Sequence, residues 1–319
     1  MFLGIEIGGT KLQFGVGPGD GSSLVASRRC DIRIAEGAAG ILQQIATVAP
    51  EFIRQYSIER IGIGFGGPVD VARGCVRTSH QVAGWDGVPL VDWCRKQLNR
   101  PAVLGNDCDL AGLAEARFGA GQKHRIVFYV TVGTGIGGGL VIGGQLHGAN
   151  RPAVAEIGHL RPGPEARSAK ATAESLAAGP GLVNTARRRL AEPGVDAREA
   201  AEFLACCGGD LRQLSGKQIG ALAQDGNRLA QEVLESGLRV LGWAVAQVIT
   251  LTAAEVVIVG GGVSLLGETL FFAPLRRWTA EYVFPPLADA YLISPAALGE
   301  DVVVHGALAL AAGGATSPQ

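Results

Sequence analysis

The chain has 319 residues, with 28 Lys or Arg, 29 Asp or Glu and a formal net charge of −1. This length is too great for one small core and fits two α/β domains, which would leave a cleft between them. The nearly neutral charge gives no basic field for a polyanion, so we expect no nucleic-acid partner. The basic triplet Arg187–Arg189 lies in an apparently helical, Ala-rich stretch and is typical of a solvated helix face.

Cysteine usage and hydropathy bear on the compartment. The six cysteines show no C-x-x-C spacing, and the N-terminus lacks a basic region followed by an apolar run. We therefore expect a reducing, cytoplasmic location. The longest apolar stretches, 126–144 and 240–262, are broken by Gly clusters or by Gln247 and Glu255, so no membrane span or membrane partner is predicted.

The first part of the chain predicts alternating strands and helices. A Gly-rich elbow joins the first two strands, and Pro50 is predicted to kink or split the first helix. The predicted strands are 2–7, 12–16, 24–34, 61–65 and 102–104, and the predicted helices are about 41–53, 88–98 and 108–118.

The opening pattern returns in the middle of the chain. An apolar strand over 126–132 is followed by a Gly-rich turn and a strand over 139–142, which indicates an internal duplication. A mostly helical region follows, with a helix over 237–252 that is apolar all round and predicted to be buried. The last predicted elements are a strand over 256–259 and a helix over about 301–312.

The duplication sets the expected domain boundary, near 115–122. We predict an N-terminal α/β domain over 1–118, joined by the C-terminal helix at about 301–319. The C-terminal α/β domain is predicted over 119–300.

The two Gly-rich turns suggest phosphate binding. The glycines at 133–138 fit the dinucleotide pattern G-x-G-x-x-G, but they lead into a strand and not into a helix. Such a hairpin can instead offer backbone N–H groups and a Thr hydroxyl to phosphate oxygens, and the alternative is a purely structural turn. The candidate residues are Gly8, Gly9, Thr10 and Lys11 in the first turn and Gly133, Thr134 and Gly135 in the second.

Six segments occur in the order of the signatures of the ROK sugar kinases and regulators, and they resemble them over nearly the whole chain. They are Ile5–Lys11, Gly64–Asp70, Gly105–Asp107, Thr131–Gly139, Glu156–His159 and Val257–Gly262. The resemblance implies a duplicated actin-like (ribonuclease H-like) two-domain α/β fold with an interdomain cleft. It also implies ATP, Mg²⁺ and a sugar as ligands, nucleotide contacts at Gly261 and Gly262, and a homodimer.

Phosphoryl transfer to a hydroxyl needs restrained phosphates, a divalent metal and a base that orients the nucleophile. The resemblance places Asp107 beside the primary hydroxyl of the sugar as this base. Without the resemblance, Asp107 would be assigned as a helix N-cap. Its neighbour Asn106 suits a sugar hydroxyl, and the alternative is that it closes a turn.

Three further side chains are candidates for the sugar shell, because carboxylates and imidazoles make directional bonds to ring hydroxyls. Glu156 and His159 share the segment Glu-Ile-Gly-His, and Glu174 is similar to a later sugar-binding Glu of the family. The alternatives are a solvated helix face for Glu174 and a structural role for His159.

The chain departs from the family pattern at two places that concern metals. Glu6 stands where the family usually has Asp, which moves the carboxylate relative to metal and phosphates. The family also has a Cys-rich zinc loop, whereas the segment 160–173 contains no cysteine. We assign no metal ligands and expect no structural zinc, because only His159 remains of the four ligands that a closed site requires.

These observations predict ATP-dependent phosphorylation of a hexose at its primary hydroxyl, with glucose as first choice. Fructokinase, mannokinase and N-acetylhexosamine kinase activities of the same family are the alternatives. A non-catalytic sugar-sensing regulator is another. It is disfavoured because Asp107 is present and because the first hairpin starts at Phe2, which leaves no room for a preceding DNA-binding segment.

Overall fold

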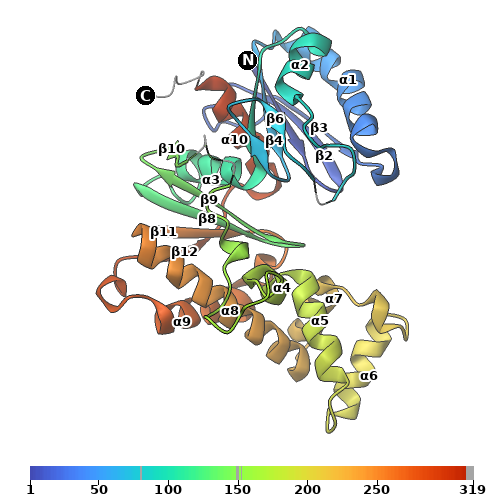
Figure 1. Ribbon diagram of the computed structural model, residues 1–319, viewed down its shortest axis with the longest axis vertical. Helices are drawn as coiled ribbons and strands as arrows, with labels where there is room; N and C mark the ends of the chain where they lie inside the picture. The colour runs from blue at the N-terminus through green and yellow to red at the C-terminus, as the bar shows by residue number, and fades with distance from the viewer. Residues whose placement is uncertain (80, 149–150, 152, 314–319) are drawn as a thin grey trace. The chain divides into compact units, whose positions relative to one another are not determined.

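The computed structural model describes residues 1–79, 81–148, 151 and 153–313 (Figure 1). The last part of the predicted segment 301–319 therefore lies outside the described residues. The chain divides into two compact units. The first contains Met1–Arg125, Gly139–Val154 and the segment that begins at Ala297, and the second contains Ile126–Gly138 and Ala155–Ala296. The domain boundaries at 118/119 and 300/301 stay a prediction.

The strands are short and mostly buried. They are β1 (Phe2–Ile7), β2 (Lys11–Gly17), β3 (Ala26–Asp31), β4 (Arg60–Phe65), β5 (Val69–Asp70), β6 (Cys75–Val76), β7 (Ala102–Asn106), β8 (Ile126–Val132), β9 (Ile136–Ile142), β10 (Gln145–Leu146), β11 (Val256–Gly260) and β12 (Leu292–Pro295).

The α-helices differ widely in length. They are α1 (Gly37–Tyr56), α2 (Leu90–Leu98), α3 (Asp107–Phe118), α4 (Ala173–Ala177), α5 (Gly179–Leu190), α6 (Ala197–Cys206), α7 (Gly216–Gln224), α8 (Arg228–Thr252), α9 (Ala273–Tyr282) and α10 (Val302–Ala312). Short 3-10 or π turns are η1 (Ile34–Glu36), η2 (Ile157–His159), η3 (Leu211–Gln213), η4 (Ser264–Leu266), η5 (Glu268–Phe272), η6 (Pro285–Leu287) and η7 (Gly299–Asp301).

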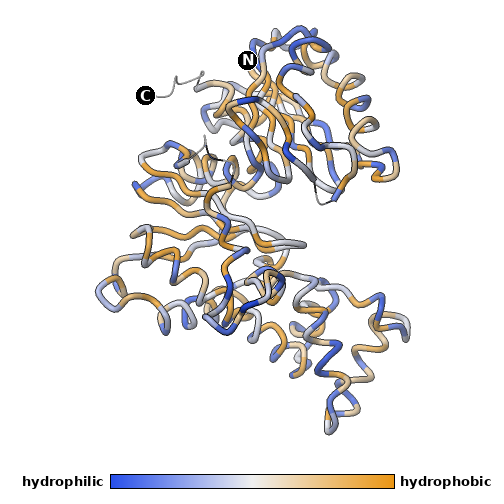
Figure 2. Tube along the Cα trace, in the orientation of Figure 1, coloured by the Kyte–Doolittle hydropathy of each residue, from blue (hydrophilic) through white to orange (hydrophobic). Residues whose placement is uncertain are grey.

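The two five-stranded sheets have the same topology. Their strand orders are β3-β2-β1-β4-β7 and β10-β9-β8-β11-β12. In the first sheet β1 pairs antiparallel with β2 and parallel with β4, and in the second β8 and β12 both pair parallel with β11. The repeated order confirms the internal duplication that the two Gly-rich hairpins predict. Figure 2 shows apolar residues concentrated along the strands and polar residues along the loops.

Glycines allow α10 to approach the first sheet closely. A Cβ atom on Gly62 of β4 would lie 1.9 Å from the carbonyl oxygen of Ala307 in α10. A Cβ atom on Gly306 would lie 2.0 Å from the carbonyl oxygen of Leu110 in α3. Backbone therefore packs on backbone at both contacts, and no larger residue fits without a shift of the helix. The helices α3 and α10 lie side by side in this unit (Figure 1).

The opposite side of the first core contains α1 and α2. Their buried residues, which include Ile41, Ile45 and Leu90, form one cluster with the apolar residues of the strands. Pro50 does not split the first helix as predicted, because α1 runs through Pro50 for twenty residues, and the alternative of a kink stays a prediction. Burial of Ala49 and Phe52 on either side keeps the segment helical although Pro50 donates no backbone hydrogen bond.

In the second unit α8 is the longest helix, and it contacts α4, α5, α7 and α9. The predicted buried helix over 237–252 is the C-terminal part of this 25-residue element. It is not buried all round, since Leu251 is 81% exposed. By length and composition alone α8 could cross a membrane, but 61% of its most apolar window is buried within the protein, as in the core helix of a globular unit.

Several predicted bounds shift by a few residues. The strand predicted over 24–34 is confined to Ala26–Asp31, the part that pairs with β2 at the edge of the sheet. The strand predicted to begin at 139 begins at Ile136, because glycines in the turn also adopt extended backbone. The helices predicted from 88 and 108 begin at Leu90 and Asp107.

The basic triplet is only partly solvated. Arg187 is half-buried and donates from Nε to the carbonyl of Leu211 and from Nη2 to that of Arg212, at 2.8 and 2.9 Å. Arg189 forms an ion pair with Glu232 at 2.7 Å. The sequence does not reveal these partners, because they lie more than twenty residues further along the chain.

A buried carboxylate holds together separate segments of the first unit. Glu115 of α3 is fully buried, and its Oε2 accepts a hydrogen bond from the backbone N–H of Ala120 at 2.9 Å. Its Oε1 accepts from the N–H groups of Ala297 and Leu298 at 2.8 and 2.9 Å. One side chain thus satisfies three backbone donors, two of them at the point where the chain re-enters this unit.

We predict that Glu115→Ala lowers the free energy of unfolding by roughly 3–5 kcal/mol, because it leaves buried N–H donors without acceptors. Urea denaturation followed by circular dichroism measures the change. Glu281→Ala, at an exposed position of α9, is the matched control and should change stability by less than about 0.5 kcal/mol. A loss below about 1 kcal/mol for Glu115→Ala would contradict this role.

Candidate functional site

The parallel register of the first sheet brings three predicted motifs to one edge. Ile7 of β1 is paired with Phe65 of β4, and Phe65 is paired with Asn106 of β7. The next residues along each strand are Gly8, Gly66 and Asp107, so these three lie side by side at the carboxyl ends of the strands. Open α/β sheets bind ligands at this edge.

Asp107 lies close to the backbone of this edge. A Cβ atom on Gly66 would be 3.3 Å from Oδ2 of Asp107 and 3.6 Å from Cα of Gly8. The carboxylate is therefore a near neighbour of the first Gly-rich turn. A residue larger than glycine at position 66 would crowd the carboxylate, a constraint that the sequence does not reveal.

Asn106 is the N-cap of α3, and the alternative assignment of Asp107 as the cap is wrong. The Asn106 side-chain oxygen accepts from the N–H groups of Cys108 and Asp109 at 2.9 and 3.3 Å. Its side-chain nitrogen donates to the carbonyl of Gly67 at 3.0 Å. Asn106 thus fixes the position at which Asp107 begins the helix, and its contact with a sugar stays a prediction.

A buried ion pair underlies the first turn. Glu6 of β1 is 7% exposed, and Lys11 Nζ lies 3.2 Å from its Oε2. The pair is close, but none of the described residues donates to Oε2 in good hydrogen-bond geometry. Burial raises the pKa of the Glu6 carboxyl from about 4.5 to about 7, Lys11 opposes this rise, and the nearby charges of Asp107 and Asp301 add to it.

Lys11 and its surroundings connect the first turn to the start of α10. Lys11 Nζ also donates to Gln13 Oε1 at 3.3 Å and to the carbonyl of Glu300 at 3.4 Å. Gln13 in turn donates to the carboxylate of Asp301. The ammonium group predicted to meet phosphate is therefore held by residues of its own unit.

The second sheet presents a matching edge. Gly260 of β11 is paired with Thr131 of β8, so Gly261 lies beside Val132 and begins the loop next to the turn Gly133–Gly135. The φ of Gly261 is +88°, and a Cβ atom there would lie 2.5 Å from the carbonyl oxygen of Val132. Only glycine fits both constraints. The predicted nucleotide residues of this unit are thus brought together.

The backbone of this edge is accessible. A Cβ atom on Gly133 or on Gly262 would meet no other atom within 4 Å, and Thr134 is exposed. Peptide N–H groups with open space beside them can approach phosphate oxygens without obstruction from side chains. The turn itself is closed by a hydrogen bond from the N–H of Gly133 to the carbonyl of Gly135 at 2.9 Å.

Two predicted sugar residues lie together at η2. His159 Nε2 is 3.9 Å from Oε2 of Glu156, and their side chains are 68% and 45% exposed. Gly158 between them allows η2 to rest on the hairpin, since a Cβ atom there would lie 2.0 Å from the carbonyl oxygen of Ile136. The spacing of Glu-x-Gly-His therefore has a packing reason in addition to any sugar contact.

The third sugar candidate, Glu174, is hydrogen-bonded to the hairpin. Its Oε2 accepts from the backbone N–H of Ile136 at 2.8 Å. Next to it, the N–H of Gly179, the first residue of α5, donates to the carbonyl of Gly133 at 2.9 Å. The sequence analysis missed Gly179, although the Gly-Pro step after Glu174 is a signal for the start of a helix.

The segment between these motifs is held without cysteine. The N–H of Ala173 donates to the carbonyl of Leu160 at 2.8 Å and closes the loop. Thr172 and Ser175 form a capping box in which each side chain accepts from the other's backbone N–H, at 3.2 and 3.0 Å. Sequence reasoning missed this pair, which the Thr-x-x-Ser spacing only weakly suggests.

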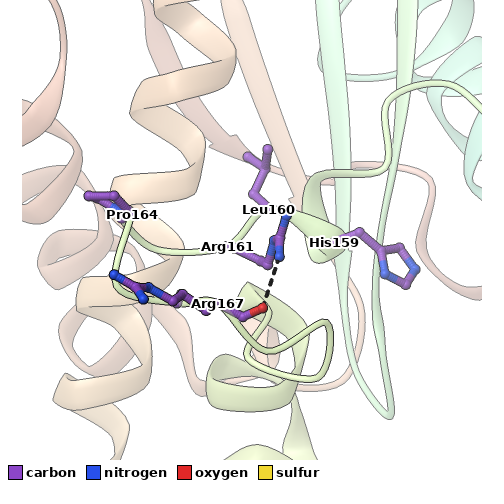
Figure 3. A pocket seen from close by; sticks show the side chains of 7 residues that line it. His159, Leu160, Arg161, Pro164 and Arg167 are labelled. Atoms are coloured by element: carbon purple, nitrogen blue, oxygen red, sulfur yellow. Dashed lines mark hydrogen bonds between the residues drawn. The ribbon is translucent and has the colours of Figure 1, made fainter.

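The same loop forms an open pocket of about 610 Å³ lined by His159, Leu160, Arg161, Gly163, Pro164, Ala166 and Arg167. In Figure 3 the ring of His159 points away from the other labelled side chains, and Arg161 donates from Nη1 to the carbonyl of Arg167 at 3.3 Å. These residues offer one imidazole and no thiolate, so they do not fit a closed structural zinc site. The expectation of no structural zinc stays a prediction.

For Mg²⁺ the donor chemistry is different. Within the described parts of the chain, no three His, Cys, Asp or Glu side chains converge on one metal position. Mg²⁺ in phosphoryl-transfer sites is held by one or two carboxylates together with substrate phosphates and water. The carboxylates of Glu6 and Asp107, which interact electrostatically at the carboxyl edge, fit that smaller requirement.

Comparison with known proteins agrees with this arrangement. The sequence model of the ROK family matches residues 2–313. The chain is 30% identical to the glucokinase of Thermotoga maritima over 312 residues, which is 97% of this chain and 96% of that protein. It is 31% identical to the N-acetyl-D-glucosamine kinase of Vibrio cholerae over 162 residues, 50% of this chain and 52% of that protein.

A solved structure, the ROK family glucokinase from Streptomyces griseus in complex with glucose and AMPPNP, is 30% identical with a TM-score of 0.82. The match covers 98% of this chain and 99% of that chain. The chain therefore belongs to the ROK family. It is a glucokinase-like hexose kinase, and the predicted duplicated actin-like fold is confirmed.

The raised pKa of Glu6 predicts a pH dependence of stability. Between about pH 4.5 and 7 the folded chain keeps a proton on Glu6 that the unfolded chain releases, so this group lowers stability as pH rises. The loss is complete above pH 7 and amounts to roughly 3 kcal/mol. Relative to the wild type, Glu6→Gln should gain stability over this pH range, because a neutral amide does not titrate.

Urea unfolding of both proteins at pH 4.5, 6 and 8 measures this difference, with Glu281→Gln as the surface control. A stability difference between wild type and Glu6→Gln that stays constant with pH would show that Glu6 titrates normally.

Proposed function

We propose that this kinase transfers the γ-phosphoryl group of ATP to the primary hydroxyl of glucose, with Asp107 as general base. The main support is the placement of the Asp107 carboxylate beside the first Gly-rich turn, at the carboxyl edge of β1, β4 and β7. Relatives over nearly the full length, named glucokinases, favour glucose among the hexoses.

The local structure around Asp107 supports its proposed role as base. It follows a buried strand and begins α3, and the Asn106 cap fixes the backbone on which it stands. A carboxylate on such a rigid element can accept the proton of the sugar hydroxyl while the hydroxyl oxygen attacks phosphorus. Placement of the reacting groups is, together with electrostatic stabilisation of the phosphoryl group, the main contribution a protein makes to the chemical step of a kinase.

The phosphates are assigned to backbone groups. Gly8, Gly9, Thr10 and Lys11 would bind on one sheet edge, and Gly133, Thr134, Gly135, Gly261 and Gly262 on the other. The support is the accessible peptide backbone of the second turn and the exposed hydroxyls of Thr10 and Thr134. Mg²⁺, when bound, would neutralise charge on the phosphates, and the carboxylates of Glu6 and Asp107 are its candidate ligands.

The sugar shell is assigned to Asn106, Glu156, His159 and Glu174. Glu156 and His159 are supported by their exposure and by their mutual approach at η2. Recognition of hydroxyls by several directional partners discriminates strongly, because an analogue that lacks one hydroxyl leaves a polar group unpaired. The N-acetyl-D-glucosamine kinase relative makes N-acetylated sugars the main competing substrates.

We also propose that the protein is cytoplasmic and that it forms a homodimer. The six cysteines show no C-x-x-C spacing in the sequence, which supports a reducing compartment. Analytical ultracentrifugation of the purified protein tests the dimer.

We predict that Asp107→Asn keeps the fold and the sugar affinity but lowers kcat by roughly 100- to 10,000-fold, the usual contribution of a positioned base. The Oδ1 of Asp107 also accepts from the N–H of Cys108 at 2.9 Å. Asn retains the size and this acceptor but cannot accept the proton. Steady-state kinetics and calorimetric titration with glucose measure the two effects separately. A variant that keeps more than about a tenth of wild-type kcat would remove Asp107 from this role.

A coupled assay with Mg-ATP and a panel of sugars tests the substrate. We expect kcat/KM to be higher for glucose than for mannose, fructose or any N-acetylated amino sugar. A higher kcat/KM for any of these competitors would refute glucose as the preferred substrate and leave the kinase assignment intact.

A further inference from the structure

Glu174 contacts the phosphate turn of its own unit. Its Oε2 lies 2.8 Å from the backbone nitrogen of Ile136, the first residue of β9 after the turn. The same oxygen would lie 2.6 Å from a Cβ atom on Gly135, so the carboxylate packs directly on the turn. A half-buried carboxylate that accepts a backbone N–H makes one of the stronger hydrogen bonds available in a protein.

Backbone hydrogen bonds hold the other parts of the turn. Gly133 donates to Gly135 across the turn, and Gly133 accepts from Gly179 of α5. Among these contacts, the hydrogen bond donated by the backbone of Ile136 is the one that a side chain accepts. A side-chain substitution can therefore remove this hydrogen bond and leave the backbone hydrogen bonds of the turn in place.

Glu174 is itself held in place. It is the second residue of α4, which begins with the reciprocal cap between Thr172 and Ser175. Thr172 and Ala173 are buried, so the start of this short helix is fixed on the core of the unit. The carboxylate is thus presented to the hairpin by a rigid element.

Ile136 of the hairpin also contacts the segment that contains Glu156 and His159. The carbonyl of Ile136 lies against Gly158 of η2, between Glu156 and His159. Helix α4 also packs on η2. Both segments assigned to the sugar shell in this unit therefore contact Ile136, one at its N–H and one at its carbonyl.

We propose that Glu174 is a positioning residue for the nucleotide: its carboxylate fixes the turn Gly133–Gly135 through the N–H of Ile136. This inference rests on the proposed phosphate role of the turn. It differs from a purely sugar-binding role for Glu174, for which nucleotide affinity would not change on substitution. A carboxylate has two oxygens, so a bond to Ile136 through Oε2 is compatible with a sugar contact through the other.

Removing the carboxylate should weaken nucleotide use. Without an acceptor for Ile136, the turn loses its preferred arrangement, and ATP must then order it at the expense of binding free energy. We expect Glu174→Ala to raise KM for ATP and the Kd for AMPPNP, measured without sugar, by about 10- to 100-fold. Glu174→Gln keeps an oxygen acceptor, so both constants should stay within about fivefold of wild type.

Calorimetry with AMPPNP alone isolates this effect from sugar binding. Glu281→Ala is the matched control and should leave both constants unchanged. If Glu174→Ala does not fold, Glu174→Asp withdraws the carboxylate by one methylene and should raise the AMPPNP Kd in the same direction. Thermal melting of each variant shows that a change in Kd does not come from unfolding.

Unchanged AMPPNP affinity in a folded Glu174→Ala protein would overturn the inference, as would a Gln variant as impaired in AMPPNP binding as the Ala variant. Failure of the proposed function looks different. In that case the wild-type protein itself shows no turnover of glucose. If only the inference about Glu174 fails, the wild-type protein still turns over glucose, but substitution of Glu174 does not change nucleotide affinity.

Discussion

The parallel register of β1, β4 and β7 is the constraint on which the site of the first unit depends. Because Ile7, Phe65 and Asn106 are aligned across these strands, the next residue of each strand emerges at the same edge. A shift of one residue in β7 would turn Asp107 to the other face of the sheet. The second sheet repeats the arrangement with β8 and β11, so a single topological rule places both Gly-rich turns.

Glycine serves two different purposes around these edges. At Gly158 and Gly261 a side chain would collide with a neighbouring carbonyl oxygen, so glycine allows segments of the unit to touch. At Gly133 and Gly262 a Cβ atom would meet no neighbouring atom, so glycine leaves the backbone exposed. The first group allows the close packing around the site, and the second group forms the surface that is proposed to meet a phosphate.

The sequence predicts the fold well because the duplication repeats a recognisable pattern of strand, Gly-rich turn and strand. It also brings out the candidate residues, since motif order carries that information. It does not predict that Asn106 caps α3, that Glu174 binds Ile136 or that α1 continues through Pro50. These outcomes depend on distances between segments far apart in the chain and on burial, which local propensity does not encode. The weak Thr-x-x-Ser signal at Thr172 shows the same limit.

The membership of α10 in the first unit affects how the chain can fold during synthesis. The glycine-lined face of β1 and β4 receives α10, and Glu115 needs the N–H groups of Ala297 and Leu298. Domains usually fold from the N-terminus as the ribosome extends the chain. The ribosome begins the first unit before the second but completes it last, because its final helix follows the whole of Ala155–Ala296. The nascent first unit must therefore keep an apolar sheet face uncovered while the second unit is translated.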